Sequence, residues 1–350
     1  MKILDCDVHN TYRSQHDLYP YLEEPFLSRL KEKGFGYPQE TYQSPIHTKR
    51  LDAKPENGPA GSDYPLMREQ LLDRYDLTYG VLTGEGISGL SYMTEQDYPA
   101  ALARAYNSWL MDTWLQYDKR FLGSMHVAIQ HPEAAAAEIY RCGSHPKIVQ
   151  VSIPASTPMP LSHPFYRPVL RAAAEMDLVV ALHFRQPGIA SAPVTPVGTP
   201  PLYIDYHALI SLPYMSQLVM LVTSGVFVEF PKLKILLVEG GFIWAIHLLW
   251  RMDKEYKTLH RQVPALKKLP SEYVRQHVKF GVQPMYEPRE AAMLQQVIEA
   301  GELQQSLVFG GDYPHWDADE PEFVMRFMKE EWRQSIMYDN MAAWYKGIEK

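Results

Sequence analysis

The sequence predicts an α/β protein folded as a (β/α)8 TIM barrel with loop insertions on the C-terminal face. Short apolar runs rich in Val, Ile and Leu recur at long intervals, and most are followed by a stretch with helical periodicity. Eight such runs can be counted, the number of strands that closes this barrel. The 350 residues, of which 46% are apolar, fit one large core. We therefore expect a single domain over residues 1–350.

The elements are placed by their periodicity. In ALARAYNSWLMDTWL (101–115), apolar residues recur at three- and four-residue steps, which predicts a helix on the outside of the barrel. The apolar runs predict parallel strands joined by such helices. In chain order, the expected strands are 2–7, 78–83, 121–127, 147–152, 178–183, 234–239, 277–282 and 306–311.

Two stretches interrupt the alternation. Residues 10–62 contain many Pro, Tyr and Gly but little periodicity, and 185–202 form a Pro-rich segment directly after the fifth expected strand. Long loops that follow barrel strands lie over the active face. Both stretches are candidate lid insertions; the alternative is that they are plain surface insertions.

Composition excludes several classes of protein. Lys and Arg number 34 against 41 Asp and Glu, a net charge of −7, and no basic run is long enough to follow a phosphate backbone. No stretch reaches the roughly 18 apolar residues of a membrane span. Only Cys6 and Cys142 are present, too few for the disulfide framework of a secreted protein. We expect a cytoplasmic protein with a small-molecule substrate, binding neither nucleic acid nor membranes.

Candidate ligands appear first in the segment DCDVH. Asp5, Asp7 and His9 stand two residues apart at the end of the first expected strand, so a strict period of two sends all three side chains to one face, the barrel interior. Carboxylate and imidazole together bind zinc, iron or manganese. Asp5 lies deeper than the other two, where it either ligates the ion or supports a ligand.

Three further strands end in the same residue types. His183 ends LVVALH, Glu239 ends KILLVE, and Asp312 ends SLVFGGD. Each has an ordinary explanation, such as a core histidine or a turn-forming Asp before Pro314. In a barrel, however, the carboxyl ends of all strands meet on one face. Together with Asp7 and His9, these residues predict a metal site there.

The chain resembles the amidohydrolase-related family, which includes aminocarboxymuconate-semialdehyde decarboxylase and γ-resorcylate decarboxylase. The resemblance covers about residues 3–345, and its most specific pieces are DCDVH, SGVFVEFPKLKILLVEGGFIW and FGGDYPHWD. It implies a (β/α)8 barrel, a homo-oligomer and a metal-dependent hydrolase or carboxy-lyase acting on a small carboxylate-bearing compound. The divalent metal of the family is bound at positions that correspond to Asp7, His9, His183 and Asp312.

One position departs from the family. Its decarboxylases usually carry His at the end of the sixth strand, where this chain has Glu239. A carboxylate there suits either one ion, with Glu239 as a base, or two ions bridged by Glu239. Manganese and iron are then as suitable as zinc. The alternative function is accordingly a dinuclear non-haem iron or manganese/iron oxygenase on the same barrel. A third, non-catalytic hypothesis is a barrel that keeps its metal only for structure.

Roles follow from the chemistry of the side chains. Asp312 is expected to orient a metal-bound water or to accept its proton, and Glu239 to act as the second catalytic carboxylate. Arg185 can clamp a substrate carboxylate, although a surface ion pair explains it equally well. His207 and His315 are candidate substrate contacts or supports for the ligands.

Overall fold

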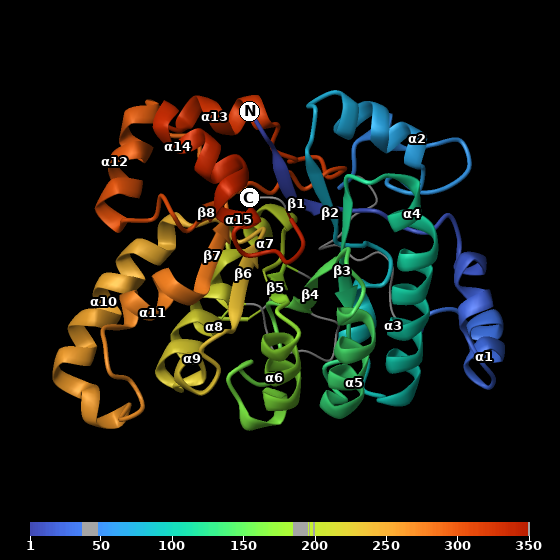
Figure 1. Cartoon of the computed structure of the whole chain (residues 1–350), viewed down its shortest axis with the longest axis horizontal. Coiled ribbons are helices and arrows are strands. Elements are labelled where there is room, and N and C mark those ends of the chain that lie inside the picture. The colour runs from blue at the N-terminus through green and yellow to red at the C-terminus, as the bar shows by residue number, and fades with distance from the viewer. Residues whose placement is uncertain (37–47, 185–194, 196, 199, 349–350) are drawn as a thin grey trace.

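The computed structural model describes residues 1–36, 48–184, 195, 197–198 and 200–348. Its eight strands form one parallel sheet in the order β1 to β8, which confirms the predicted (β/α)8 barrel (Figure 1). Each strand lies within or beside its predicted range. The strands are β1 Leu4–Val8, β2 Tyr79–Leu82, β3 Phe121–His126, β4 Ile148–Pro154, β5 Val179–His183, β6 Lys234–Val238, β7 Val278–Gly281 and β8 Leu307–Val308.

The barrel closes where the end of the chain returns to β1. Cys6 N donates to Phe309 O at 3.1 Å, and a parallel bridge joins Val8 to Tyr313. Asp312 N donates to Asp7 O at 3.0 Å. These bonds lie beyond the short β8, so the segment that carries Asp312 is held directly against β1.

The helices lie outside the strands, as Figure 1 shows. In α6, Val169, Leu170 and Ala173 face the barrel and are buried, whereas Arg171 and Glu175 are exposed. None of the helices in the described part of the chain is long and apolar enough to cross a bilayer. The α-helices are α1 Phe26–Lys33, α2 Tyr64–Met67, α3 Asp97–Trp109, α4 Leu115–Tyr117, α5 Pro132–Gly143, α6 Arg167–Glu175, α7 Tyr203–Ala208, α8 Ser211–Thr223, α9 Val226–Glu229, α10 Ile243–Leu259, α11 Pro270–His277, α12 Ala291–Gly301, α13 Pro321–Phe327, α14 Glu330–Gln334 and α15 Asn340–Ala342.

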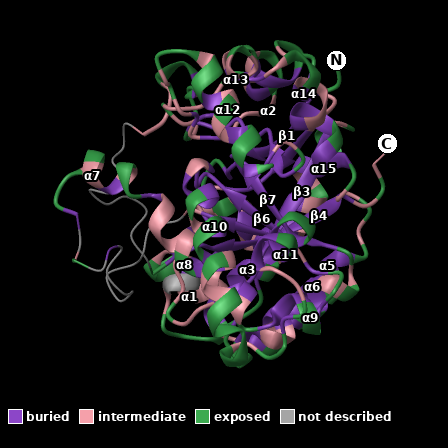
Figure 2. Cartoon of the chain, turned by 90° about the vertical axis from the view of Figure 1, so that its left-hand side faces the viewer, coloured by how far each residue is buried: buried purple, intermediate pink, exposed green. Residues whose placement is uncertain are grey.

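The core has two parts. A large cluster fills the space between the strands and the helices. A smaller cluster, called the inner cluster below, contains residues from β1 to β6 and β8 and is completed by Tyr338, Met341 and Tyr345 from the C-terminal segment. Strand residues are buried almost throughout, as Figure 2 shows for the centre of the molecule (Figure 2). This explains why the strands appear in the sequence as continuous apolar runs.

The two candidate lid segments differ in how much of them the structure describes. Between residues 48 and 62, the first segment contacts the loop after β8: Arg50 N donates to Pro314 O at 2.9 Å, and Trp316 N donates to Thr48 O at 2.8 Å. Most of 185–202 lies outside the described residues. Helix α7, which follows it, stands at the edge of the molecule in Figure 2. The lid function of both segments and the single-domain assignment stay predictions.

Candidate metal centre

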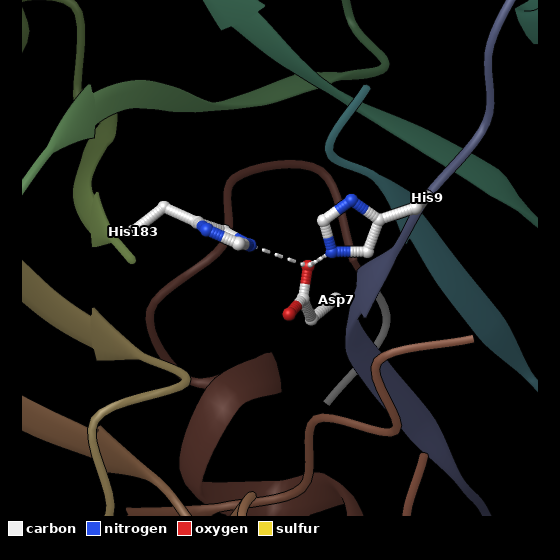
Figure 3. Close-up of side chains that lie close together, drawn as sticks. All are labelled: Asp7, His9 and His183. Carbon is white, nitrogen blue, oxygen red and sulfur yellow. Dashed lines mark hydrogen bonds and ion pairs between the residues drawn. The ribbon is translucent and has the colours of Figure 1, made fainter. Parts of the chain in front are cut away.

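Four of the predicted ligands come together at the carboxyl ends of the strands. Asp7 lies in β1 and His9 directly after it, His183 is the last residue of β5, and Asp312 follows β8. Figure 3 shows Asp7, His9 and His183 pointing toward one another (Figure 3). All four are buried, with at most 2% of each residue exposed. Glu239, directly after β6, lies beside this group.

The donor atoms lie within contact distance of one another. Asp7 Oδ1 is 3.1 Å from His183 Nε2 and 3.2 Å from His9 Nε2. The same His9 nitrogen is 2.9 Å from Asp312 Oδ1. Glu239 Oε2 is 3.4 Å from His183 Nδ1, on the side of that ring away from Asp7. Two groups able to hold an ion therefore share His9: one with Asp7 and His183, the other with Asp312 and His315.

Two of the carboxylates stand on unusual backbone. Glu239 and Asp312 both have φ of +60°, in the left-handed region that non-glycine residues rarely occupy. Both stand beyond the carboxyl end of a strand, Glu239 directly after β6 and Asp312 four residues after β8. Such conformations cost on the order of 1–3 kcal/mol and concentrate at functional sites. The same strain at two strand ends supports a functional role for both residues.

Among the described residues, Asp5 lies in neither of the two ligand groups. Leu4 and Cys6 pack in the inner cluster, and the pairing of β1 with β2 shifts register between Asp5 and Val8, so period-two alternation does not hold along the whole strand. Support of a ligand was one of the two roles expected for Asp5. Asp5 accepts hydrogen bonds from Asp7 N at 2.9 Å and Gly311 N at 2.8 Å. It ties together the two segments that carry ligands.

Burial and mutual repulsion act on the pKa values of these carboxyls. Burial raises the pKa of Asp5 to about 8, although two backbone amides oppose this rise. Burial, together with Asp312 and Asp7, raises the pKa of Glu239 well above its usual range. Burial also opposes ionisation of Asp7, but the His183 and His9 rings outweigh it and hold the pKa of Asp7 well below its usual range.

The same balance governs His9. Burial lowers the pKa of this ring, but Asp7, Asp312 and Glu85 outweigh burial and raise it well above its usual value. The buried carboxylates of the site are therefore stabilised by nearby positive charge. A divalent cation would supply such a charge.

The residues present fit a divalent metal ion. Nε2 of the buried His9 makes no hydrogen bond of acceptable geometry to a described residue, although Asp312 Oδ1 lies 2.9 Å and Asp7 Oδ1 3.2 Å away from it. This nitrogen therefore faces a point shared by several carboxylate oxygens rather than one partner. Imidazole nitrogen with carboxylate oxygen suits zinc, manganese and iron.

Three predicted site residues remain to be placed: His315, His207 and Arg185. His315 Nδ1 lies 2.6 Å from Asp312 Oδ1, so His315 supports this carboxylate directly. His207 Nε2 lies 3.0 Å from Asp317 Oδ2 and is not within the two ligand groups. Arg185 lies outside the described residues. The roles assigned to these residues stay predictions.

Several residues that contact the ligands were not predicted. Glu85 Oε2 lies 2.9 Å from His9 Nδ1, and Lys49 Nζ lies 3.1 Å from Glu85 Oε1. Burial disfavours the Glu85 anion, but Lys49 and His9 outweigh burial and hold the pKa of Glu85 well below its usual range. Glu85 follows β2 just as the predicted ligands follow their strands, so the same rule would have found it. Lys49 lies in an irregular segment and gave no such signal.

Two further residues support the carboxylates. Thr83 Oγ1 donates to Asp7 Oδ1 at 2.7 Å, and His126 Nε2 lies 2.8 Å from Thr83 O. Gln283 Nε2 donates to Asp312 Oδ2 at 3.3 Å and to Asp317 Oδ2 at 3.2 Å. Thr83 and Gln283 each stand one or two residues beyond a strand, β2 or β7. Thr83 and Gln283 thus add support from two strands that carry none of the proposed ligands.

Comparison with known proteins identifies the family of this chain. The family model described as amidohydrolase matches residues 4–347. The γ-resorcylate decarboxylase of Rhodococcus jostii (strain RHA1) is 26% identical over 244 residues, covering 66% of this chain and 69% of that protein.

Solved structures share the fold. The 5-carboxyvanillate decarboxylase of Sphingomonas paucimobilis superposes with a TM-score of 0.69 at 20% identity, covering 98% of both chains. An amidohydrolase of Mycobacterium avium subsp. paratuberculosis superposes with a TM-score of 0.73 at 18% identity, covering 97% of this chain and 98% of that one. A dihydroxybenzoic acid decarboxylase of Polaromonas sp. JS666, with manganese bound, has a TM-score of 0.67 at 16% identity, covering 98% and 96%. With its family match over nearly the whole chain, this protein belongs to the amidohydrolase family and is a metal-dependent enzyme.

Proposed function

We propose that this chain is a carboxy-lyase or hydrolase of small carboxylate-bearing compounds, in which Asp7, His9, His183 and Asp312 hold one divalent metal ion. One observation carries the proposal: donor atoms from β1, β5 and the segment after β8 converge in a buried site at the carboxyl ends of the strands. This is the face on which TIM-barrel enzymes carry out their chemistry. The manganese in a solved structure of similar fold favours manganese over zinc or iron.

The bound ion would polarise a substrate carboxylate or lower the pKa of a water molecule. Asp312 is placed to hold or accept a proton, because its Oδ1 contacts both His9 and His315. Glu239 supplies a second carboxyl group on the far side of His183, 3.4 Å from Nδ1 of that ring, and is the second candidate proton donor. Asp312 and Glu239 thus contact different histidines.

The resemblance to γ-resorcylate decarboxylase favours the carboxy-lyase. In that reaction the bond between the carbon skeleton and the carboxylate breaks, CO2 leaves, and the same carbon receives a proton. Either Asp312 or Glu239 would deliver that proton. Glu239 stands where decarboxylases of this family usually carry His, so the proton donor is the step in which this chain would differ from them.

A second candidate is the dinuclear oxygenase. It is favoured by the second ligand group, His9, Asp312 and His315, next to the extra carboxylate of Glu239. Carboxylate-rich sites with some imidazole suit iron and manganese. The two functions differ in the number of ions per chain and in the need for oxygen.

Turnover by the manganese-loaded protein distinguishes the carboxy-lyase from the oxygenase. We would incubate it with a panel of hydroxybenzoates and other aromatic carboxylates, with and without oxygen, and measure CO2 release and oxygen consumption. CO2 release that is independent of oxygen supports the carboxy-lyase. Oxygen consumption that depends on substrate and on two ions per chain would replace it with the oxygenase. Asp7→Asn is the control that removes a ligand.

Assembly and location are further parts of the proposal. We expect a homo-oligomer that binds a small molecule and works in the cytoplasm. Light scattering coupled to size-exclusion chromatography tests the first, because a monomer at micromolar concentration would contradict it.

A further inference from the structure

The N-terminal insertion reaches the metal centre through a short backbone pairing. Lys49 forms an antiparallel bridge with His315. Arg50 N donates to Pro314 O and Trp316 N to Thr48 O on either side of that bridge. Residues 48–50 are therefore held against the loop that follows the ligand Asp312, which fixes where the Lys49 side chain begins.

From this position Lys49 begins a chain of charged contacts that ends at a metal ligand. Its Nζ lies 3.1 Å from Glu85 Oε1, and Glu85 Oε2 lies 2.9 Å from His9 Nδ1. His9 Nε2 faces Asp7 and Asp312. The Lys49 and Glu85 side chains are only 23% and 21% exposed, so the pair is better shielded from water than an ordinary surface ion pair.

We propose that Glu85 and Lys49 are positioning residues for His9, so that the insertion completes the metal site of the barrel. This inference rests on the proposed function, because it takes His9 as a metal ligand. Glu85 acts on the ring nitrogen that faces away from Asp7 and Asp312, and Lys49 holds the Glu85 carboxylate in place. Neither residue needs to contact the ion.

The physical basis is the effect of a carboxylate on a ligand ring. A histidine that binds metal through one nitrogen usually presents the other to a carboxylate, which fixes the ring orientation and makes the ligand more basic. A carboxylate on a flexible side chain is effective only when it is itself held. Here Lys49 holds the Glu85 carboxylate, although it lies 36 residues before Glu85 in the sequence.

Lys49→Met separates this role from simple electrostatics. Removing a positive charge near a cation site should tighten binding of Mn²⁺ if charge alone mattered. Positioning predicts the opposite, with Mn²⁺ bound roughly 10-fold more weakly, and Glu85→Gln should weaken binding by about 10- to 100-fold. Lys49→Arg should restore most of the affinity. Mn²⁺ alone is the probe, and its binding is measured by titration calorimetry of the chelator-treated protein.

A remote ion pair provides the matched control. Lys329 contacts Glu299 on the surface, with side chains 31% and 45% exposed. Lys329→Met and Glu299→Gln should leave Mn²⁺ affinity unchanged. Far-ultraviolet circular dichroism and the melting temperature of each variant confirm that it is folded.

The outcomes are distinct. Unchanged or tighter binding by a folded Lys49→Met variant would overturn the positioning role of Lys49. The visible spectrum of the Co²⁺ form tests Glu85: a spectrum retained in Glu85→Gln supports positioning, whereas a change in coordination number would make Glu85 a ligand and overturn the inference. If the wild-type protein bound no divalent ion, the proposed function itself would fail.

Discussion

The two ends of the barrel bury different kinds of side chain. At the carboxyl ends of the strands, carboxylates and imidazoles are buried, among them Asp7, His183 and Asp312. At the amino ends, apolar residues such as Leu122 and Val149 pack with Tyr338 and other residues of the C-terminal segment. Burying charged groups at the carboxyl end costs free energy unless a ligand compensates their charge, whereas apolar packing at the amino end stabilises the fold.

Buried polar groups at the two ends also differ in their hydrogen bonds. Near the amino end, Tyr345 Oη donates to Gln150 Oε1 at 2.5 Å, and Lys279 Nζ donates to Gln305 O at 2.8 Å. At the carboxyl end, Nε2 of His9 makes no hydrogen bond of acceptable geometry to a described residue. Substitutions at the two ends should therefore affect different properties of the protein.

The largest expected effect is on turnover at the carboxyl end. Asp312→Asn keeps the shape of the side chain but removes its proton-accepting oxygen, so we expect turnover to fall by about 10²- to 10⁴-fold. The fold should be retained, because the change removes one of several crowded buried charges. Steady-state kinetics and a thermal melt are the measurements. Normal turnover by this variant would remove Asp312 from the mechanism.

The next effect is on stability at the amino end. Leu122 is 5% exposed and packs in the inner cluster, so Leu122→Ala should lower the free energy of unfolding by about 2–5 kcal/mol. The variant should still bind Mn²⁺ with wild-type affinity at a temperature where it is folded. Urea unfolding and calorimetry give the two quantities. A loss of metal affinity without a loss of stability would contradict the separation of the two ends.

The smallest effect is on the pH dependence of stability. Burial raises the pKa of Asp319 from 3.8 to about 7, helped by Asp317 and Asp312. A carboxyl with a higher pKa in the folded state stabilises the protein at low pH, and this contribution is lost as the pH rises from about 4 to 7. Asp319→Asn should therefore become more stable relative to the wild type between pH 4 and 8, by on the order of 2 kcal/mol.

Urea unfolding of the metal-free wild type and the Asp319→Asn variant at pH 4, 6 and 8 checks this expectation. A stability difference that does not depend on pH would show that Asp319 titrates normally in the folded protein.

The strands and the convergence of the four proposed ligands were predictable because both depend on local patterns. Buried parallel strands appear as apolar runs, and a barrel brings their carboxyl ends to one face. Asp7, His183 and Asp312 could therefore be found from position alone. The carboxylate of Glu85 follows the same rule, but it stands three residues beyond the end of β2 and not at the strand end itself.

Other features depend on contacts that a linear pattern does not contain. The register of β1 shifts between Asp5 and Val8, and period-two alternation carries no sign of such a shift. Lys49 reaches the site through backbone pairing with a segment more than 260 residues later, which periodicity cannot indicate. The support from Thr83 and Gln283 likewise depends on neighbouring strands closing around the site.

Elemental analysis of the purified protein tests the central claim most directly. Protein produced with manganese, iron and zinc available should contain about one divalent ion per chain. Asp7→Asn and His183→Ala should lose the ion, and Leu122→Ala should keep it. Two ions per chain would favour the oxygenase over the proposed carboxy-lyase or hydrolase. A wild-type protein without a bound ion, or an ion retained after both ligands are replaced together, would contradict the assignment of the metal centre.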